Sequence, residues 1–388
     1  METILPQSEA ELADEIRQAA SSGQTFAVRG GGTRNSRELP VDAVLSTRAL
    51  SGVSLYEPGA LTLVVKAGTP VRDVEALLAA EKQHLAFEPW DPLGLSGRNG
   101  TPTVGGMAAV NASGPRRIKA GACRDAMLGV RFVDGSGTVI KNGGRVMKNV
   151  TGLDLVKLLA GSHGTLGVMT EVAFRVQPRP EVTASVVLDG LDLATASAAM
   201  IAALGTPYDV SGAAHLPDGP EGAPMTVLRL EGLEGSVRHR VRELAAVLRR
   251  FGPTRTLEGG SIWESIRDAS GMGARTGALW RISVRPGDGA RLASILDKAE
   301  VLLDWAGGLL WVLASEDHDI RAAMAGIPGH ATLVRGDAET RARWGVFHPE
   351  PEPVAALSTG LRARFDPAGV FNPGLMGDAR QMRVSEGA

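Results

Sequence analysis

The 388-residue sequence contains a single cysteine, Cys123, and only 16 aromatic residues. One cysteine excludes an intrachain disulfide, an iron–sulfur cluster ligated by cysteines and a structural zinc site. Long apolar runs are also lacking, because aspartates interrupt the most apolar stretches, so no membrane span is expected. The acidic, amphipathic start of the chain is unlike a secretory signal. With 44% apolar and 22% charged residues, the composition predicts a cytoplasmic globular protein.

Several catalytic and binding motifs are absent as well. No GxGxxG fingerprint follows a strand-like segment and no Gly-Lys dipeptide occurs, so neither a Rossmann site nor a P-loop is predicted. The sequence has no HExxH and no GxSxG segment, which disfavours zinc-hydrolase and serine-elbow mechanisms. The seven histidines lie far apart without the spacing of metal ligands, so we expect no metal site.

Glycine, in contrast, is abundant: the chain has 49, and 16 of them fall within residues 94–167. The same window carries ten lysines and arginines but only three acidic residues, a net charge of +7. A glycine-rich, basic segment indicates close approach of the backbone to an anion. The window has one aromatic residue, Phe132, which is too few to stack nucleic-acid bases. We therefore expect a phosphate-bearing small molecule and no nucleic acid.

The distribution of apolar residues predicts strands and helices in alternation. A long ordered loop with short helical turns is expected over 84–125, followed by a β-hairpin that turns at 134–137. Prolines within 177–180 indicate a domain border. Beyond it, strand-like segments alternate with helical ones, including a helix expected over about 289–305, which suggests an open sheet covered by helices. The turn-rich segment 365–374 contains apolar residues and is expected to dock on a core.

Four glycine-bearing segments are candidates for the anion site: RGGGTRNS (29–36), the small-residue run 101–114, GGRVMKNVTG (143–152) and GSHGTLGV (161–168). The first follows a strand, and the backbone N–H groups of such a glycine nest converge on an anion. The second would let a bulky planar ligand lie flat on the backbone. A surface turn or tight helix packing explains each segment taken alone. The ordered series of four favours one extended ligand.

This series resembles the PCMH-type (vanillyl-alcohol-oxidase-like) FAD-binding flavoproteins. The matching segments are RGGGT (29–33), TVGGMAAVNASGPRR (103–117), MKNVTGLDLVKLLAGSHGTLGVMTEV (147–172) and FDPAGVFNPG (365–374). Within the family, the chain is most similar to the smaller flavin subunits of heteromeric bacterial glycolate oxidases.

The resemblance implies an α+β fold with three parts. A PCMH-type FAD-binding domain, made of two α/β subdomains, is expected at 1–180. A second α+β cap domain, built on an antiparallel sheet, is expected at 181–362. The remaining residues, 363–388, are expected to form a C-terminal tail that returns to the FAD domain.

The resemblance also implies that FAD binds non-covalently, because Thr33 stands near the position where covalent members carry a histidine. The residues that it assigns to FAD are Arg29, Gly30, Gly31, Gly32, Thr33, Arg34, Asn35, Thr103, Gly105, Gly106, Ala109, Asn111, Ser113, Gly114, Gly161, Gly164, Thr165, Gly167 and Val168. Two positions depart from the family pattern. His163 replaces a glutamate, so no side-chain role is carried over to it, and Leu153 replaces a tyrosine, which would loosen one edge of the site.

Oxidation of a 2-hydroxy acid on FAD requires a cation that holds the carboxylate and a base that takes the hydroxyl proton. The candidate cations in the second domain are Arg281 and Arg335, and the candidate base is His330. An ion pair or a place in a loop is the commoner use of each of these residue types. The histidine-rich stretch that the resemblance assigns to a catalytic larger subunit is reduced here to Gly329–Ala331.

These observations predict an FAD-binding subunit of a heteromeric glycolate oxidase, which converts the 2-hydroxy acid glycolate to glyoxylate. Its expected partners are a larger FAD-binding catalytic subunit and an iron–sulfur subunit, because one cysteine cannot hold the clusters that carry electrons onward. A cytoplasmic location is expected, with contact to a membrane only through partner subunits. Two alternatives stay open: a stand-alone FAD-dependent dehydrogenase of another 2-hydroxy acid such as D-lactate, and a non-catalytic assembly subunit.

Overall fold

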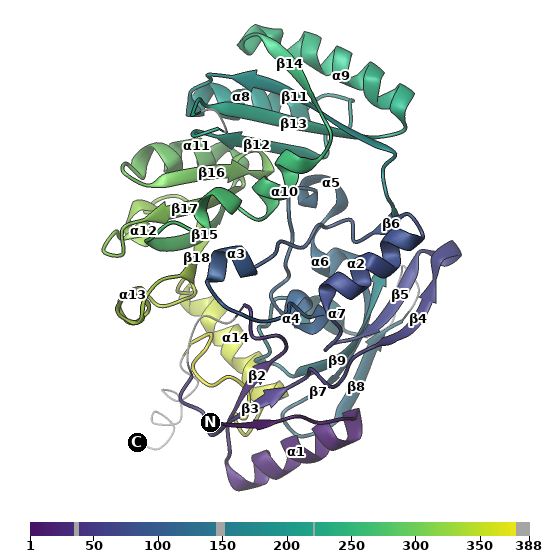
Figure 1. The fold of residues 1–388 in the computed structure, drawn as a ribbon. Coiled ribbons are helices and arrows are strands. Elements are labelled where there is room, and N and C mark those ends of the chain that lie inside the picture. Colours follow the sequence, from purple (N-terminus) through teal and green to yellow (C-terminus); the bar gives the residue numbers. More distant parts are fainter. Residues whose placement is uncertain (35–38, 145–151, 220–221, 378–388) are drawn as a thin grey trace.

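The computed structural model describes residues 1–34, 39–144, 152–219 and 222–377, and Figure 1 shows their arrangement. At the bottom of this view, a three-stranded parallel sheet of order β1-β3-β2 packs against helix α1. Ser8 caps α1 by accepting a hydrogen bond from the Glu11 N–H, and Leu12 and Ile16 are buried against the sheet. The elements are β1 (Glu2–Ile4), α1 (Glu9–Ser22), β2 (Phe26–Arg29) and β3 (Ala43–Ser46).

A five-stranded antiparallel sheet of order β4-β5-β9-β7-β8 forms the larger layer of this amino-terminal region, which comprises residues 1–178. Strands β7 and β8 form the predicted hairpin, in which Asp134 Oδ1 accepts hydrogen bonds from the N–H groups of Ser136 and Thr138. The elements are β4 (Val53–Glu57), η1 (Pro58–Ala60), β5 (Thr62–Lys66), α2 (Val71–Ala80), β7 (Met127–Val133), β8 (Val139–Gly143), α7 (Leu155–Leu159) and β9 (Val168–Arg175). A short strand β6 (Gln83–His84) pairs separately with β10 (Gln177–Pro178).

The long loop expected over 84–125 is confirmed, and it carries four short helices. They are α3 (Leu93–Ser96), α4 (Val104–Ala109), α5 (Arg117–Ala120) and α6 (Cys123–Ala126). The loop crosses the middle of the molecule in Figure 1. Trp90, Leu95 and Ile118 of this loop pack into the same apolar cluster as residues of the upper sheet, so the loop joins the two regions. We call this contact the seam.

The upper half of Figure 1 is an eight-stranded antiparallel sheet of order β14-β11-β13-β12-β16-β17-β15-β18, which confirms the predicted antiparallel cap sheet. Its strands are β11 (Val182–Asp189), β12 (Gly212–Leu216), β13 (Met225–Gly232), β14 (Thr254–Glu258), β15 (Ala278–Val284), β16 (Glu300–Asp304), β17 (Leu309–Ala314) and β18 (Gly329–Arg335). One face is covered by α8 (Leu193–Leu204), α9 (Glu234–Leu248), η2 (Arg249–Phe251), α11 (Pro286–Ile295) and α12 (Ile320–Ala323). The other face meets the seam, together with α10 (Ser261–Arg267) and η3 (Ser270–Met272).

The helix expected over 289–305 is wrong in its second half. Helix α11 ends at Ile295, and β16 lies in the sheet between β12 and β17. A turn separates the two elements, with Lys298 at a φ of 64°. A short apolar run such as VLL fits either a helix or a buried strand, and here pairing within the sheet decides for the strand. Strands β12, β14 and β18 were not predicted, since a segment such as GAAHL in β12 has no β-branched residues.

Buried charges fix the seam. Glu88 of the long loop accepts two hydrogen bonds from Arg229 of β13, at 2.9 and 2.8 Å. Arg116 binds Glu231 of β13 through two guanidinium nitrogens, and its main-chain N–H donates to Glu88. Ser211 completes the group by donating to Glu231 at 2.6 Å. Removing one member would leave a buried charge without its partner, so this network holds the two regions in one arrangement.

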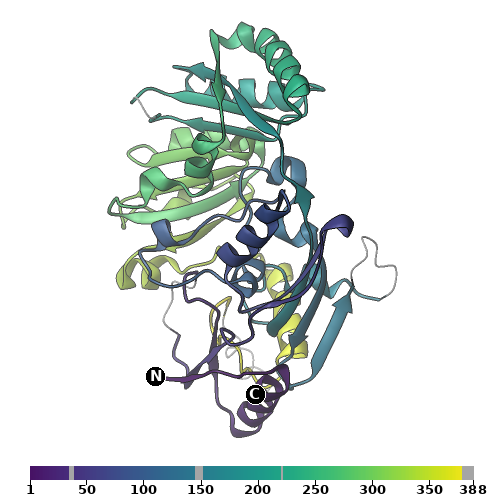
Figure 2. The same cartoon turned by 45° about the vertical axis from the view of Figure 1, so that its right-hand side comes forward.

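The chain returns to the amino-terminal region through α13 (Ala338–Trp344) and α14 (Glu352–Phe365), as Figure 2 shows. Phe365 packs against Phe132 of β7, with ring centroids 6.2 Å apart. Further on, the Val370 carbonyl accepts from the Phe26 N–H and the Asn372 N–H donates to the Phe26 carbonyl. The docking of segment 365–374 on a core is therefore confirmed. The division of the chain at 180/181 and 362/363 stays a prediction, and its second boundary lies inside α14.

In the described ranges, the structure has no helix with the length and apolar character needed to cross a bilayer.

Candidate functional site

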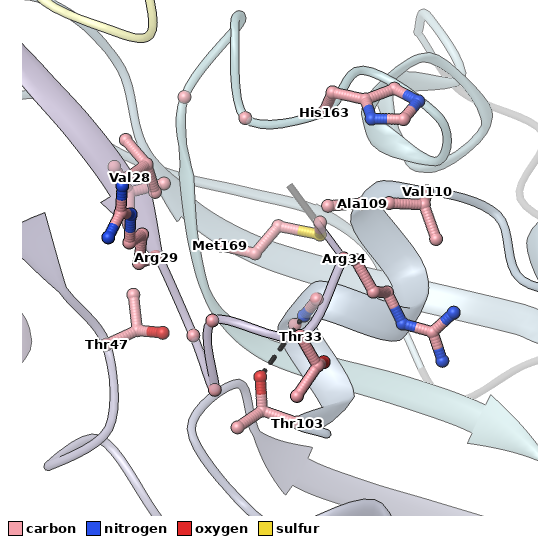
Figure 3. Close-up of a pocket in the computed structure, with 18 residues that line it drawn as sticks. Val28, Arg29, Thr33, Arg34, Thr47, Thr103, Ala109, Val110, His163 and Met169 are labelled. Carbon is pink, nitrogen blue, oxygen red and sulfur yellow. Dashed lines mark hydrogen bonds between the residues drawn. The ribbon is translucent and has the colours of Figure 1, made fainter. Parts of the chain in front are cut away.

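A pocket of about 650 Å³ opens where the end of β2, the start of α4 and the loop before β9 meet (Figure 3). The residues that line it are Val28, Arg29, Gly30, Gly31, Gly32, Thr33, Arg34, Thr47, Thr103, Gly105, Gly106, Ala109, Val110, His163, Gly164, Gly167, Val168 and Met169. We call it the glycine pocket.

Glycines 30–32 form one wall, where a side chain would clash at Gly30 and Gly31 and would be strained by the backbone conformation at Gly32. A methyl group on Gly31 would lie 1.6 Å from the Thr101 carbonyl oxygen, and one on Gly30 would lie 2.1 Å from the Thr103 hydroxyl. Gly32 has a φ of +75°, which side chains rarely adopt, and has open space in front of it. The chain therefore presents main-chain atoms to the pocket at this wall.

The start of α4 forms the second wall, also with small residues. The Thr103 hydroxyl caps this helix and accepts a hydrogen bond from the Gly106 N–H at 3.4 Å, drawn in Figure 3. Gly105 packs on Ala67, where an added methyl group would meet the alanine side chain at 2.8 Å. Gly105 packs closely on the β5 side of the helix, whereas the small side chain of Ala109 lines the pocket. This wall therefore leaves room for a flat ligand.

The loop before β9 forms the third wall, and the tail of the chain holds it in place. The Asn372 amide donates to the carbonyls of His163 and Gly164 at 3.0 and 3.1 Å, and its oxygen accepts from the Val28 N–H at 2.9 Å. One buried side chain thus ties two walls of the pocket together. Docking of the tail on the core was predicted from the sequence, but no role was predicted for Asn372. The available signal was its position in the family-matched segment 365–374.

His163 lines this third wall with a neutral ring. Burial lowers the pKa of His163 to about 4, so the imidazole carries no charge near neutral pH. The ring stands edge-on to Phe347, with centroids 4.7 Å apart. His163 has a φ of 53° and is followed by Gly164 at 71°, so the backbone turns sharply at the pocket edge.

Arg34 also lines the glycine pocket and carries a positive charge. Its guanidinium lies 4.5 Å from the Trp90 ring centroid, and Nη2 donates to the Trp90 carbonyl. Nε and Nη1 are buried and have no hydrogen-bond partner in the described part of the chain. Burial lowers the pKa of Arg34 to about 10, so the group remains charged near neutral pH. Arg34 also lines a second cavity of about 650 Å³, together with Trp90 and Arg267.

Of the residues assigned to FAD by the resemblance, thirteen line the glycine pocket: Arg29, Gly30, Gly31, Gly32, Thr33, Arg34, Thr103, Gly105, Gly106, Ala109, Gly164, Gly167 and Val168. Asn35 lies outside the described residues. Contact of any of these residues with FAD stays a prediction. Sequence reasoning missed Val28, Thr47, Val110 and Met169, which flank the motifs or lie on neighbouring strands and have no local signal.

Five assigned residues do not line the pocket and instead support the loops behind it. Asn111 Oδ1 accepts from the Arg124 N–H, and the Ser113 hydroxyl donates to the Asn111 carbonyl. The Gly161 N–H donates to the Ala108 carbonyl, and the Thr165 hydroxyl donates to the Ser162 carbonyl. Gly114 packs against Glu88, where an added methyl group would meet the Glu88 carbonyl oxygen at 2.4 Å.

Arg335, a candidate carboxylate clamp, holds main-chain carbonyls in the structure. Nη1 donates to the carbonyls of Leu95 and Gly273, and Nη2 donates to those of Met272 and Arg275. Both terminal nitrogens are therefore engaged in joining β18 to the loops around α3 and η3. The geometry favours a structural role for Arg335 over a clamp.

Arg281 and His330, the other candidates, lie on the same face of the large sheet. Arg281 of β15 stands opposite Thr332 of β18, and His330 stands opposite Ser283, two residues further along β15. His330 is exposed, but partial burial of its ring and the positive charges of Arg281, His348 and Arg117 lower its pKa. A neutral imidazole can accept a proton.

Two further positions, Leu153 and Cys123, supply no reactive or pocket-lining group. Leu153 is 78% exposed and lies outside the glycine pocket. Cys123 is fully buried, and burial raises the pKa of its thiol, so no reactive thiolate forms there. Across the described ranges, no three His, Cys, Asp or Glu side chains are grouped as metal ligands.

The glycine pocket fits FAD in shape and charge. Main-chain N–H groups of the nest suit a pyrophosphate, small residues leave a flat surface, and Arg34 has buried donors without partners. Together with the large antiparallel sheet of the upper half, this site defines a PCMH-type FAD-binding flavoprotein.

Comparisons with known proteins agree. A family model described as "FAD binding domain" matches residues 2–143. The chain is 34% identical over 370 residues to the glycolate oxidase subunit GlcE of Escherichia coli (strain K12), covering 94% of this chain and 96% of that one. It is 32% identical over 179 residues to the D-lactate dehydrogenase of Archaeoglobus fulgidus, covering 45% and 38%. The chain therefore belongs to the PCMH-type FAD-binding oxidoreductase family.

A solved structure supports the fold. Alkyldihydroxyacetonephosphate synthase superposes with a TM-score of 0.68 at 14% sequence identity, covering 96% of this chain and 76% of that one. At this identity the likeness concerns the arrangement of the elements alone.

Proposed function

We propose that this chain is the FAD-holding subunit of a heteromeric glycolate oxidase, an enzyme that converts glycolate to glyoxylate. The observation that carries the proposal is the glycine pocket, in which three sequence-distant glycine segments meet as an FAD site requires. The near full-length similarity to the glycolate oxidase subunit GlcE supports the choice of substrate.

In this proposal the three walls have separate tasks. The main-chain N–H groups of 30–33 hold the pyrophosphate of FAD, and Arg34 adds a buried positive charge. The small residues of α4 support the flat part of the cofactor, and the neutral His163 closes the third wall without adding charge. Bound FAD supplies the chemistry, since it accepts two electrons from the hydroxy acid.

Electrons must then leave through another chain. The single cysteine, Cys123, is buried, so this chain cannot ligate an iron–sulfur cluster. The proposed partners are therefore a larger FAD-binding catalytic subunit and an iron–sulfur subunit. The complex is proposed to be cytoplasmic, with membrane contact only through those partners.

The test is purification of the chain alone and together with candidate partner subunits. We expect FAD to be released from the chain on denaturation, and glycolate-dependent reduction of an artificial acceptor to need the partners. A chain that stays free of flavin after reconstitution with FAD would overturn the proposal. Turnover of D-lactate but not glycolate by the chain alone would instead support a stand-alone dehydrogenase, the activity named for the Archaeoglobus relative.

A further inference from the structure

Two arginines from different regions meet on one tryptophan at the seam. The guanidinium carbon of Arg117, in α5, lies 4.6 Å from the ring centroid of Trp305, and that of Arg281, in β15, lies 5.0 Å from the same centroid. Trp305 begins η4 (Trp305–Gly307), directly after β16. Arg281 is also within 5.9 Å of the Trp311 ring. Aromatic faces attract cations, so the indoles hold both guanidinium groups in one place.

The Trp305 indole is held firmly. Its main-chain N–H donates to Asp304 Oδ1 at 2.7 Å, and its ring N–H donates to the Gly114 carbonyl at 3.0 Å. Trp305 and Ala306 have φ values of 52° and 56°, so two consecutive residues with side chains adopt the left-handed backbone conformation. Such a backbone conformation is unfavourable for residues with side chains, and it collects at functional sites. The structure keeps this costly conformation where it supports the two arginines.

Within the described part of the chain neither arginine forms an ion pair, unlike its neighbours in the seam. In the described ranges, no carboxylate lies within 4.0 Å of Arg117 or Arg281, whereas Arg116 and Arg229 each pair with Glu88 and Glu231. The Arg281 Nε is buried and has no hydrogen-bond partner among the residues that the structure describes. A buried, unpaired donor next to a second cation is costly unless an anion completes it.

The titratable groups around the two arginines do not fully neutralise their positive charge. Asp304 is buried and bound to the Trp305 N–H, and burial raises its pKa to about 7, so it is only partly ionised near neutral pH. His330 and His348 approach from β18 and the segment after α13. His348 Nδ1 accepts from the Ala331 N–H at 3.3 Å, which joins the two histidine-bearing segments.

Two segments of the chain connect this cluster to the glycine pocket. On one side, Ala109 and Val110 line the pocket and the chain continues to Arg117. On the other side, Phe347 packs on the pocket residue His163 and is followed by His348. The cluster is therefore linked to the pocket walls by short stretches of chain, seven residues from Val110 to Arg117 and one from Phe347 to His348.

We propose that Arg117 and Arg281, held by Trp305, form a binding site for a carboxylate at the seam. The site takes the carboxylate of a small 2-hydroxy acid, and this choice of ligand rests on the function proposed above. Arg281 thus binds the carboxylate in this proposal, together with Arg117. Arg335 instead binds main-chain carbonyls of the protein. The same two cations could also take a free oxyanion, so inorganic phosphate is the alternative ligand that the experiment must separate.

The experiment is calorimetric titration of the purified, FAD-loaded chain with glycolate, with the uncharged glycolamide and with inorganic phosphate. We expect glycolate to bind and glycolamide not to bind. Arg117→Met and Arg281→Met should each weaken glycolate binding about tenfold or more, and Arg281→Lys should restore part of it, because lysine keeps the charge without the planar fork. Arg285→Met is the matched control, since Arg285 is exposed and pairs with Asp288.

Three results would overturn the proposal: equal binding of glycolate and glycolamide, glycolate affinity unchanged in both methionine variants, or binding of phosphate without glycolate. The comparison of glycolate with glycolamide uses the unaltered chain, so it holds even if a variant fails to fold. FAD content is measured in parallel and should stay unchanged in all variants. Loss of FAD from the unaltered chain would count against the proposed function, whereas intact FAD without glycolate binding would count against this site alone.

Discussion

Main-chain atoms form much of the glycine pocket, whereas side chains from distant segments form the seam. In the pocket, Gly30 and Gly31 are fixed by contacts that leave no room for a methyl group. In the seam, Arg117, Arg281 and Trp305 come from three separate elements and meet through cation–aromatic contacts. A site made of backbone tolerates almost no change at its glycines. A site made of side chains can lose one member and keep its fold, so the two should respond differently to substitution.

Gly31→Ala should have the largest effect, because the added methyl group would lie 1.6 Å from the Thr101 carbonyl oxygen and must displace one wall of the pocket. We expect FAD affinity to fall about 100-fold, equal to about 3 kcal/mol. The measurement is titration of the flavin-free protein with FAD. Gly235→Ala, in α9 with no atom within 4 Å of the added methyl group, is the control and should bind FAD normally. Equal affinity in both variants would contradict the backbone description of the pocket.

Asn372→Ala should have the next largest effect, because three buried main-chain groups lose their partner at once. We expect a loss of about 3 kcal/mol in the free energy of unfolding, and about tenfold weaker FAD binding. Denaturant unfolding and FAD titration measure the two effects.

A second variant separates the contribution of the Asn372 side-chain hydrogen bonds from that of its backbone conformation. Asn372 has a φ of 43°, which glycine adopts without strain, so Asn372→Gly loses the same bonds but relieves the backbone. It should fall between the alanine variant and the unaltered chain in stability. If it matches the unaltered chain, the side-chain bonds contribute nothing.

The seam network should make the stability of the chain depend on pH through a carboxylate. Although burial acts in the opposite direction, hydrogen bonds from Arg116 and Ser211 and the charge of Arg229 lower the pKa of Glu231 to about 2, against an ordinary 4.5. Because the folded pKa is the lower one, this stabilisation is present above about pH 4.5 and is lost as the pH falls towards 2. We expect Glu231→Gln to cost about 2 kcal/mol near neutral pH.

The free energy of unfolding, measured for both proteins from pH 7 to pH 3, tests this expectation. The difference between Glu231→Gln and the unaltered chain should shrink as the pH falls. Glu234→Gln, which removes an exposed carboxylate from the start of α9, is the control and should show no such trend. A difference that stays constant over the whole range would mean that the Glu231 charge does not stabilise the seam.

The same contrast explains what the sequence could predict. The pocket was foreseeable because backbone close to a ligand needs glycine, and glycine leaves a local pattern such as 29–33. The role of Asn372 was not, since its partner Val28 lies 344 positions away. The meeting of Arg117 with Trp305 likewise depends on how the two regions dock, which no local pattern encodes. Strand β16 was misread for a related reason, because its short apolar run becomes a strand only through pairing with β17.

Substitution of Leu153 is expected to have the smallest effect, and it tests how far the glycine pocket extends. The family pattern places a tyrosine here, yet the leucine side chain is 78% exposed and does not line the glycine pocket. Exposed positions away from a site usually change stability by less than about 0.5 kcal/mol. We therefore expect Leu153→Tyr to leave both the free energy of unfolding and FAD affinity unchanged, in the assays used for Gly31→Ala. A clear gain in FAD affinity would show that residue 153 reaches the cofactor, and that the pocket extends beyond its three backbone walls.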